Sequence, residues 1–139
     1  LPNIRTELQD ASVCREEWKD SADVVLCDVP CSGLGIIRKK PEIRFKNPDE
    51  IRTLPEIQAR ILANCAQYVK KGGTLVYSTC TILQRENEDV VRAFLTENPE
   101  FEAVSWTHPV CGERTDGMVT LLPPVHNTDG FFIAKMHRK

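Results

Sequence analysis

Three short apolar runs, at residues 23–28, 74–78 and 131–136, most strongly limit what this chain can fold into. Each run is rich in β-branched or aromatic residues and is bounded by glycine, proline or aspartate, which is typical of buried strands. Residues 4–8 and 101–106 are weaker strand candidates. Residues 107–128 contain three prolines and little apolar periodicity, so we expect a long loop there.

Helical patterns lie between the strong strand candidates. Within residues 54–69 an apolar residue recurs at every fourth position, which gives the predicted helix one apolar face. A second helix is predicted over 84–98, ending before Pro99. Strands that alternate with helices predict an α/β fold, a doubly wound and mostly parallel sheet with flanking helices. Ligands of such sheets bind at the carboxyl ends of the strands.

The chain's length and composition exclude several classes of protein. With 139 residues, of which 41% are hydrophobic, the chain can bury one modest core. No apolar run approaches the roughly 18 residues that cross a bilayer, and the first residues lack the pattern of a signal peptide. We therefore expect a single soluble, cytoplasmic domain with no membrane partner.

The six cysteines form no CxxC pair and no cluster with histidine, so no metal site is predicted. A reduced cytosolic thiol is usually a small core residue, and we expect this of Cys14, Cys27, Cys65 and Cys111. Cys31 and Cys80 differ, because each lies within three residues of the end of a predicted strand. If the two strands are parallel neighbours, both thiols and Asp28 lie at one edge of the sheet.

The motifs at these strand ends resemble those of a known family. They are DVPCSG at 28–33, GTLVYSTCT at 73–81 and DGFF at 129–132. In order and spacing they are similar to the NOL/NOP/Sun family of RNA (cytosine-5) methyltransferases, in particular its bacterial ribosomal-RNA branch. The resemblance runs from about residue 10 to the end of the chain. It implies the Rossmann-like class I methyltransferase fold, with S-adenosylmethionine as cofactor.

The resemblance also implies roles for individual residues. C5 of cytosine is a poor nucleophile, so a thiolate first adds at C6, and the family pattern gives this role to Cys80. Cys31 would help to resolve the covalent adduct, and Asp28 would stabilise the base at its N3 edge. The cofactor would contact Asp10, Asp28 and Pro30.

A basic segment follows the Cys31 motif directly. The net charge of −2 argues weakly against a nucleic-acid partner, but five cations fall within residues 38–46. The target base must be single-stranded or flipped out, because stacking hides C5 and C6. We expect RNA, in particular ribosomal RNA, to contact Arg38, Lys39, Lys40 and Arg44 through its phosphates.

The family's strand order, 3-2-1-4-5-7-6, predicts that residues 1–139 form the C-terminal part of a catalytic domain. The chain would supply strand 3 and strands 4 to 7, because no glycine-rich cofactor turn precedes Asp10 and nothing corresponds to an N-terminal RNA-binding domain. Residues 24–27 would then form an open sheet edge. We expect this piece alone to bind the cofactor weakly and to self-associate or to be loosely ordered near residue 1.

Several alternatives remain open. A DNA cytosine-5 methyltransferase uses the same thiol addition but places its nucleophile in the proline-cysteine motif, here Cys31. An inactive methyltransferase-like fragment that only binds RNA is a second alternative. A redox role for the two thiols fits less well without CxxC spacing, and methyltransferases that act on amino groups usually carry a different turn from Val29-Pro30-Cys31.

Overall fold

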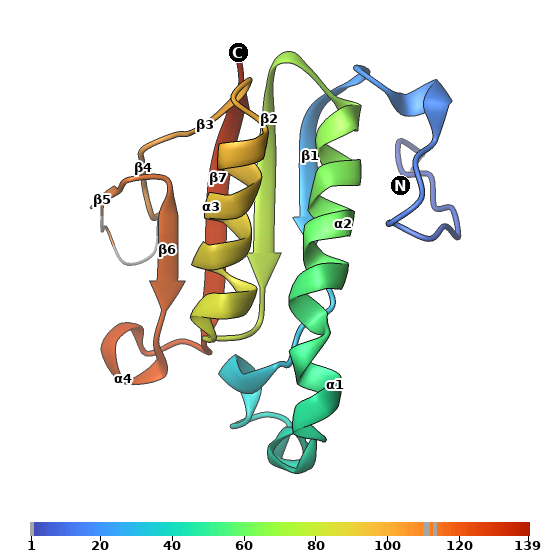
Figure 1. The fold of residues 1–139 in the computed structure, drawn as a ribbon. Helices are drawn as coiled ribbons and strands as arrows, with labels where there is room; N and C mark the ends of the chain where they lie inside the picture. Colours follow the sequence, from blue (N-terminus) through green and yellow to red (C-terminus); the bar gives the residue numbers. More distant parts are fainter. Residues whose placement is uncertain (1, 110–111, 113) are drawn as a thin grey trace.

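A computed structural model describes residues 2–109, 112 and 114–139 (Figure 1). Its main sheet is mixed: β1 and β2 are parallel, whereas β7 is antiparallel to β2, β3 and β6. The order β1-β2-β7, followed by β3 and β6 end to end along the other edge of β7, matches the expected 4-5-7-6 part of the methyltransferase sheet. The strands are β1 (Ala22–Asp28), β2 (Val69–Thr79), β3 (Phe101–Ala103), β6 (Met118–Leu121) and β7 (Phe131–Arg138). The three strong strand predictions are confirmed.

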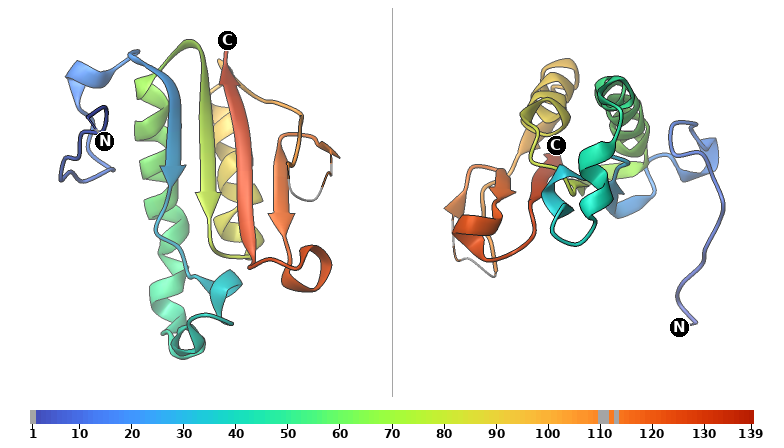
Figure 2. Two further views of the ribbon diagram at one scale, coloured as in Figure 1. Left: turned by 180° about the vertical axis from the view of Figure 1, so that it is seen from behind. Right: turned by 90° about the horizontal axis from the view of Figure 1, so that it is seen from below.

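Two helices, α2 (Leu54–Tyr68) and α3 (Glu88–Glu97), cover one face of the sheet (Figures 1 and 2). The expected doubly wound arrangement, with helices on both faces, is not seen among the described residues. The reason is the strand order, since β1, β2 and β3 advance across the sheet in one direction. Right-handed crossovers then place both connecting helices on the same side. A short helix, α1 (Pro48–Arg52), precedes α2.

The core lies between this helical layer and the sheet. Leu75 and Tyr77 of β2, Phe132 of β7 and Leu62 of α2 are fully buried. The ring of Tyr77 meets that of Phe132 edge to face, with centroids 6.1 Å apart. None of the helices in the described residues has the length and apolar character needed to span a membrane.

Helix α3 begins later than predicted. The single-turn helix η4 (Gln84–Glu86) comes first, and α3 starts only at Glu88. Between them Asn87 has φ −115° and ψ −99°, which is not a helical conformation. The interruption turns the side chains of Glu86 and Asn87 into the interior, where both are fully buried.

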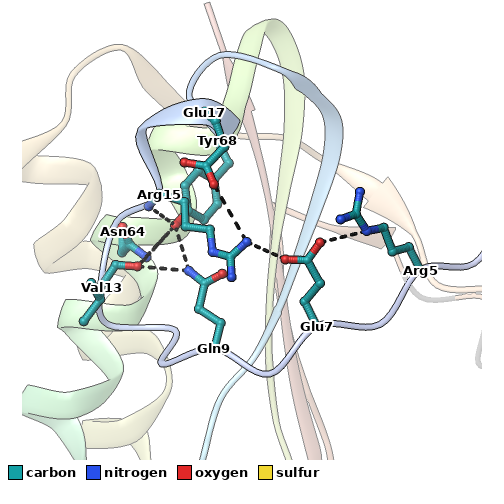
Figure 3. A network of polar contacts seen from close by, with 8 residues as sticks. All are labelled: Arg5, Glu7, Gln9, Val13, Arg15, Glu17, Asn64 and Tyr68. Carbon is teal, nitrogen blue, oxygen red and sulfur yellow. Dashed lines mark hydrogen bonds and ion pairs between the residues drawn. The ribbon is translucent and has the colours of Figure 1, made fainter.

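The predicted strand at residues 4–8 is wrong, because the described part of the N-terminal segment pairs with no strand. Side chains hold the segment to α2 instead (Figure 3). The Tyr68 hydroxyl accepts a hydrogen bond from the Arg15 amide over 3.0 Å, and Asn64 donates to the carbonyl of Val13 over 3.2 Å. The turn η1 (Glu16–Trp18) then leads into β1. The segment is thus fixed by a few polar contacts and not by a sheet ladder.

The long loop predicted over residues 107–128 is also wrong. It contains β6 and the one-turn helix α4 (Pro123–His126), and a small hairpin joins β4 (Trp106–Thr107) to β5 (Arg114–Thr115). The strand candidate at 101–106 divides into β3 and the start of β4. These strands have two to four residues each, so pairing with distant residues stabilises them, which local sequence patterns do not reveal.

Candidate active site

The thiols of Cys31 and Cys80 lie against each other, with 3.2 Å between their sulfur atoms. Asp28, the last residue of β1, pairs in register with Ser78 of parallel β2. The chain therefore leaves both strands at the same end of the sheet, where the two half-buried cysteines meet. The structure places the two residues together as the strand pattern predicted.

A pocket of about 360 Å³ opens beside the two thiols. This volume is within the range of about 300 to 1,000 Å³ that is typical of small-molecule sites. The turns η2 (Leu34–Ile36) and η3 (Pro41–Phe45), which follow the Cys31 motif, form its walls. The lining residues are Cys31, Gly33, Ile36, Lys40, Glu42, Ile43, Lys46 and Cys80. The pocket thus combines two thiols, an apolar wall and two lysines.

The environment of Cys31 favours the protonated form of its thiol. Burial, together with the contact to Cys80, raises the pKa of Cys31 to about 12. At neutral pH Cys31 therefore keeps its proton and can donate a hydrogen bond to the sulfur of Cys80. A thiolate at Cys80 would be stabilised by this donor.

The buried carboxylate of Glu86 fixes the loop that carries Cys31. The backbone amide of Ser32 donates to Oε2 of Glu86 over 2.8 Å. The side-chain amide of Gln58, on α2, donates to the same oxygen and to the carbonyl of Pro30, over 3.0 Å in each case. Ser32, Gln58 and Glu86 are fully buried. The residues on both sides of Cys31 are therefore bonded to the protein interior.

The loop that carries Cys80 is fixed by Asn87, the residue that follows Glu86 in the sequence. The hydroxyl of Thr79 donates to Oδ1 of Asn87 over 2.6 Å, and Nδ2 of Asn87 donates to the carbonyl of Thr81 over 3.0 Å. Asn87 therefore bonds to both neighbours of Cys80. The hydroxyls of Ser32 and Thr81 lie 2.7 Å apart and connect the two loops.

Gly35 joins a third loop, the one that carries Gly130, to the loop that carries Cys80. Its amide donates to the carbonyl of Cys80 over 3.0 Å, and its carbonyl accepts from the amide of Gly130 over 2.8 Å. A Cβ atom at Gly35 would lie 2.1 Å from the carbonyl oxygen of Gly130, so only glycine fits. Gly33 lines the pocket and has φ 77°, a left-handed conformation that favours glycine, and a Cβ atom there would lie 3.0 Å from Cδ1 of Ile43. Gly35 makes room for another loop of the protein.

Of the residues expected to bind the cofactor, Asp10 is not brought together with Asp28 and Pro30. Asp28 is exposed at the end of β1, where its carboxylate accepts a hydrogen bond from the hydroxyl of Ser78 over 2.8 Å. Pro30 is exposed two residues further on, and neither residue lines the cysteine pocket. Asp10 lies in a turn beside the C-terminal half of α2. The amide and hydroxyl of Ser12 bond to its carboxylate and lower its pKa.

Of the four cations expected to contact RNA, only Lys40 lines the pocket. Arg38 and Lys39 form ion pairs with Asp129, at 3.4 and 2.5 Å, and the nearby Lys39 lowers the pKa of that carboxylate. Arg44 donates to the carbonyl of Pro41, and its guanidinium lies over the ring of Phe45.

Three other residues at the site are not distinguished by their local sequence. Lys46 is one cation of the basic run, yet it lines the pocket and donates to the carbonyl of Ser32 over 2.9 Å. Glu86 and Asn87 fall in a polar stretch that resembles an exposed helix start. Only the interruption before α3 would have marked them, and local sequence patterns do not predict it.

The remaining cysteines divide into core and surface positions. Cys27 is buried in β1, and Cys65 of α2 packs against the same core, as expected. The hydrogen bond that Cys27 donates to Cys65, together with burial, raises the pKa of Cys27 far above its usual range. The core assignment of Cys14 is wrong, since its thiol lies in the N-terminal segment, 3.6 Å from Oε1 of Gln67. Cys111 lies outside the described residues.

Comparisons with known proteins cover almost the whole chain. A family model described as 16S rRNA methyltransferase RsmB/F matches residues 3–137. The probable ribosomal RNA small subunit methyltransferase B of Bacillus subtilis is 43% identical over 146 aligned positions, covering 100% of this chain and 33% of the relative. The chain thus spans about one third of the length of that relative.

Solved structures show the same fold. The crystal structure of the protein PH0851 superposes with a TM-score of 0.85 and 37% identity, covering 94% of this chain and 30% of that one. The crystal structure of NSun6 from Pyrococcus horikoshii with SFG, an analogue of S-adenosylmethionine, gives a TM-score of 0.74 and 27% identity, covering 98% and 35% of the two chains. The fold is therefore the Rossmann-like fold of these methyltransferases.

Proposed function

Because the chain belongs to the RsmB/F family of 16S rRNA methyltransferases, we propose that it forms part of the catalytic domain of an enzyme that makes 5-methylcytosine in RNA, with ribosomal RNA as substrate. One observation carries the proposal: two thiols lie 3.2 Å apart beside a pocket at the carboxyl ends of two parallel strands. Thiol addition to a pyrimidine needs one sulfur atom as nucleophile, and a second acid–base group to help remove the product.

In the proposed reaction the thiolate of Cys80 forms a bond to C6 of the target cytosine. The electron pair of the C5–C6 double bond then makes C5 nucleophilic. S-adenosylmethionine, when bound, would supply the methyl group to C5 and leave as S-adenosylhomocysteine. Removal of the C5 proton returns an electron pair to the ring, the C6–sulfur bond breaks, and Cys80 leaves as a thiolate. The C5 proton passes to a water molecule that acts as the base, and Cys31, which keeps its proton at neutral pH, assists this last step by donating a hydrogen bond to the departing thiolate of Cys80.

Charged groups near the pocket fit the remaining tasks. Asp28, oriented by Ser78, is proposed to bond to the N3 edge of the base, where negative charge develops when Cys80 adds. Lys40 at the pocket is proposed to contact RNA phosphates, as Arg38, Lys39 and Arg44 would nearby. Because Arg38 and Lys39 are ion-paired with Asp129, we expect them to contribute less to RNA binding.

The cofactor fits this chain only in part. Enzymes of the family use S-adenosylmethionine. The exposed carboxylate of Asp28 at the end of β1 could hold its polar groups, beside Pro30. Asp10 is turned toward Ser12 and lies at the other end of α2, so it does not complete a pocket. We therefore propose that the 139 residues belong to a longer protein and bind the cofactor weakly alone. Micromolar affinity by calorimetry would contradict this.

The open edge of β1 supports a further part of this proposal. Val24 and Leu26 are 63% and 66% exposed, and β1 pairs only with β2 among the described strands. An apolar strand edge favours pairing with another chain. The chain by itself is therefore proposed to self-associate, and light scattering of a strictly monomeric species would contradict this.

The decisive experiment compares the two cysteines in the full-length protein with an RNA substrate. We expect Cys80→Ala to abolish the covalent RNA adduct and to lower methyl transfer by at least about a thousandfold, a loss typical of removing a nucleophile. Cys31→Ala should still form the adduct, which then persists. The reverse pattern would instead indicate the mechanism of DNA cytosine-5 methyltransferases. No adduct and no methyl transfer by the wild type would favour an inactive RNA-binding role.

A further inference from the structure

Two consecutive buried residues, Glu86 and Asn87, hold the two cysteine loops separately. Glu86 bonds to the amide of Ser32, immediately after Cys31. Asn87 bonds to Thr79 and Thr81, on either side of Cys80. Neither side chain lines the pocket, so neither can touch a bound base there. Their effect on chemistry must pass through the positions of the two sulfur atoms.

We propose that Glu86 is the positioning residue for Cys31 and Asn87 the positioning residue for Cys80, so that each governs a different step of the reaction. The inference rests on the proposed function. Asn87 controls the approach of Cys80 to C6, whereas Glu86 controls the later step in which Cys31 assists release. Both act from one short turn, which fixes the spacing of the two thiols.

The contacts of Glu86 support its part. Its Oε2 accepts from both Ser32 and Gln58, and the Gln58 side chain also holds the carbonyl of Pro30. The carbonyl of Glu86 accepts a hydrogen bond from the hydroxyl of Tyr77 over 2.6 Å, which ties the turn to β2. The other carboxylate oxygen, Oε1, is buried without a hydrogen-bond partner among the described residues. Burying a carboxylate oxygen that has no hydrogen-bond partner lowers the stability of the fold. Such a loss is expected of a residue that serves the site and not the stability of the fold.

The contacts of Asn87 support the other part. Its amide both accepts and donates, and so recognises the Thr79 hydroxyl and the Thr81 carbonyl at once. These two groups belong to the residues directly before and after Cys80. An aspartate could not donate, and an alanine could do neither. Asn87 therefore sets the conformation of the backbone on both sides of the nucleophile.

The first experiment measures thiol reactivity without RNA. In the full-length protein, alkylation rates of Cys31 and Cys80 are followed by peptide mass spectrometry across pH 7 to 10. Glu86→Gln replaces a charge-assisted bond with a neutral one and should raise the ratio of Cys31 to Cys80 rates several-fold. Asn87→Ala should lower the ratio. Shifts in the same direction, or no shift, would overturn the inference whether or not the protein is a methyltransferase.

The second experiment separates the two steps with RNA. Glu86→Gln should form the covalent adduct at nearly the wild-type rate and resolve it about tenfold more slowly. Asn87→Ala should slow adduct formation about tenfold and leave resolution unchanged. Equal slowing of both steps by both variants would show a merely structural role and would sink the inference. If the wild type forms no adduct, the proposed function is wrong. The ratio of Cys31 to Cys80 alkylation rates then still tests whether Glu86 and Asn87 position the two thiols.

Matched variants guard against misfolding. Thr79→Val removes the donor to Asn87 but keeps the side-chain shape, and should reproduce Asn87→Ala, whereas Thr79→Ser keeps the hydroxyl and should restore the wild-type behaviour. Gln84 lies in the same turn but is exposed and bonds to Asp89, so Gln84→Ala should change neither step. A Thr79→Ser variant as slow as Thr79→Val would contradict the role of the hydrogen bond.

Discussion

The carboxyl end of the sheet and the outer side of β1 are built in opposite ways. At the carboxyl end, three loops bond to one another and to buried Glu86 and Asn87. On the outer side of β1, apolar Leu26 is exposed, and the N-terminal segment is joined mainly to α2 by side-chain contacts. Figure 2 shows this segment standing apart from the strands.

The difference teaches which contacts keep each region in place. Interlocked, buried hydrogen bonds are strong because removing one leaves its partner unsatisfied in a medium of low dielectric constant. Contacts such as that of Arg15 with Glu7, both partly exposed, contribute little by comparison. The cysteine end should therefore stay rigid under conditions in which the N-terminal segment opens.

The largest expected contrast is in thiol reactivity. The raised pKa of Cys31, about 12 against an ordinary 9.0, leaves roughly a thousandfold less thiolate at pH 8. Because the pKa is raised, the reactive form appears only as the pH climbs toward 12. In iodoacetamide labelling of the chain, we expect Cys14 to react first and Cys31 only at high pH. Rapid labelling of Cys31 at pH 8 would show that the carboxyl end is loose.

A glycine pair gives the next contrast. Gly35→Ala pushes a methyl group against the Gly130 carbonyl and should lower the free energy of unfolding by about 3 kcal/mol. Gly72, at the opposite end of β2, has open space where an alanine methyl group would lie, but its φ is +80°. Gly72→Ala should therefore cost only about 1 kcal/mol, for backbone strain. Urea unfolding measures both, and equal losses would remove the contrast.

Two tyrosines test the hydrogen bonds of the two regions. Tyr77→Phe leaves the buried carbonyl of Glu86 without its donor and should cost about 2 kcal/mol. Tyr68→Phe removes the acceptor for the Arg15 amide, which water can replace, and should cost about 1 kcal/mol. Hydrogen exchange should show faster opening of residues 9–15 only in Tyr68→Phe. Faster exchange around Cys80 in that variant would mean that the regions are coupled.

The smallest effect on stability is expected at the open strand edge. Leu26 is 66% exposed, so Leu26→Lys should change the free energy of unfolding by less than about 0.5 kcal/mol. A charge on an edge strand opposes pairing with a second chain. Sedimentation should show reduced self-association at unchanged stability. Exposed Arg92→Lys, on α3, serves as the control and should leave association unchanged.

The sequence was most informative where the local pattern and the topology agree. Parallel strands at 23–28 and 74–78 predicted the meeting of Cys31 and Cys80, because the carboxyl ends of such strands share an edge. The predicted strand at 4–8 failed, since a strand needs a neighbour that pairs with it. β6 was missed for the opposite reason, because pairing with β7 stabilises a run of only four residues.

The parts of the site that could not be predicted depend on burial. Glu86 and Asn87 look like residues of an exposed helix start, and only the packing of η4 against the two loops makes them internal. Likewise, nothing local indicates that Arg38 and Lys39 face Asp129, which lies far along the sequence. The cysteines were identified by motif, whereas the groups that hold them come from contacts distant in sequence.

Among the described strands of the sheet, the last one to be synthesised is a central one. β7 lies between β2 on one side and β3 and β6 on the other, so none of these strands can complete its pairing before residues 131–138 have been synthesised. The earlier strands must wait with open edges, a stage at which nascent chains are prone to aggregate. If synthesis stalls a few codons before β7, both cysteines stand on a sheet that still lacks its central strand.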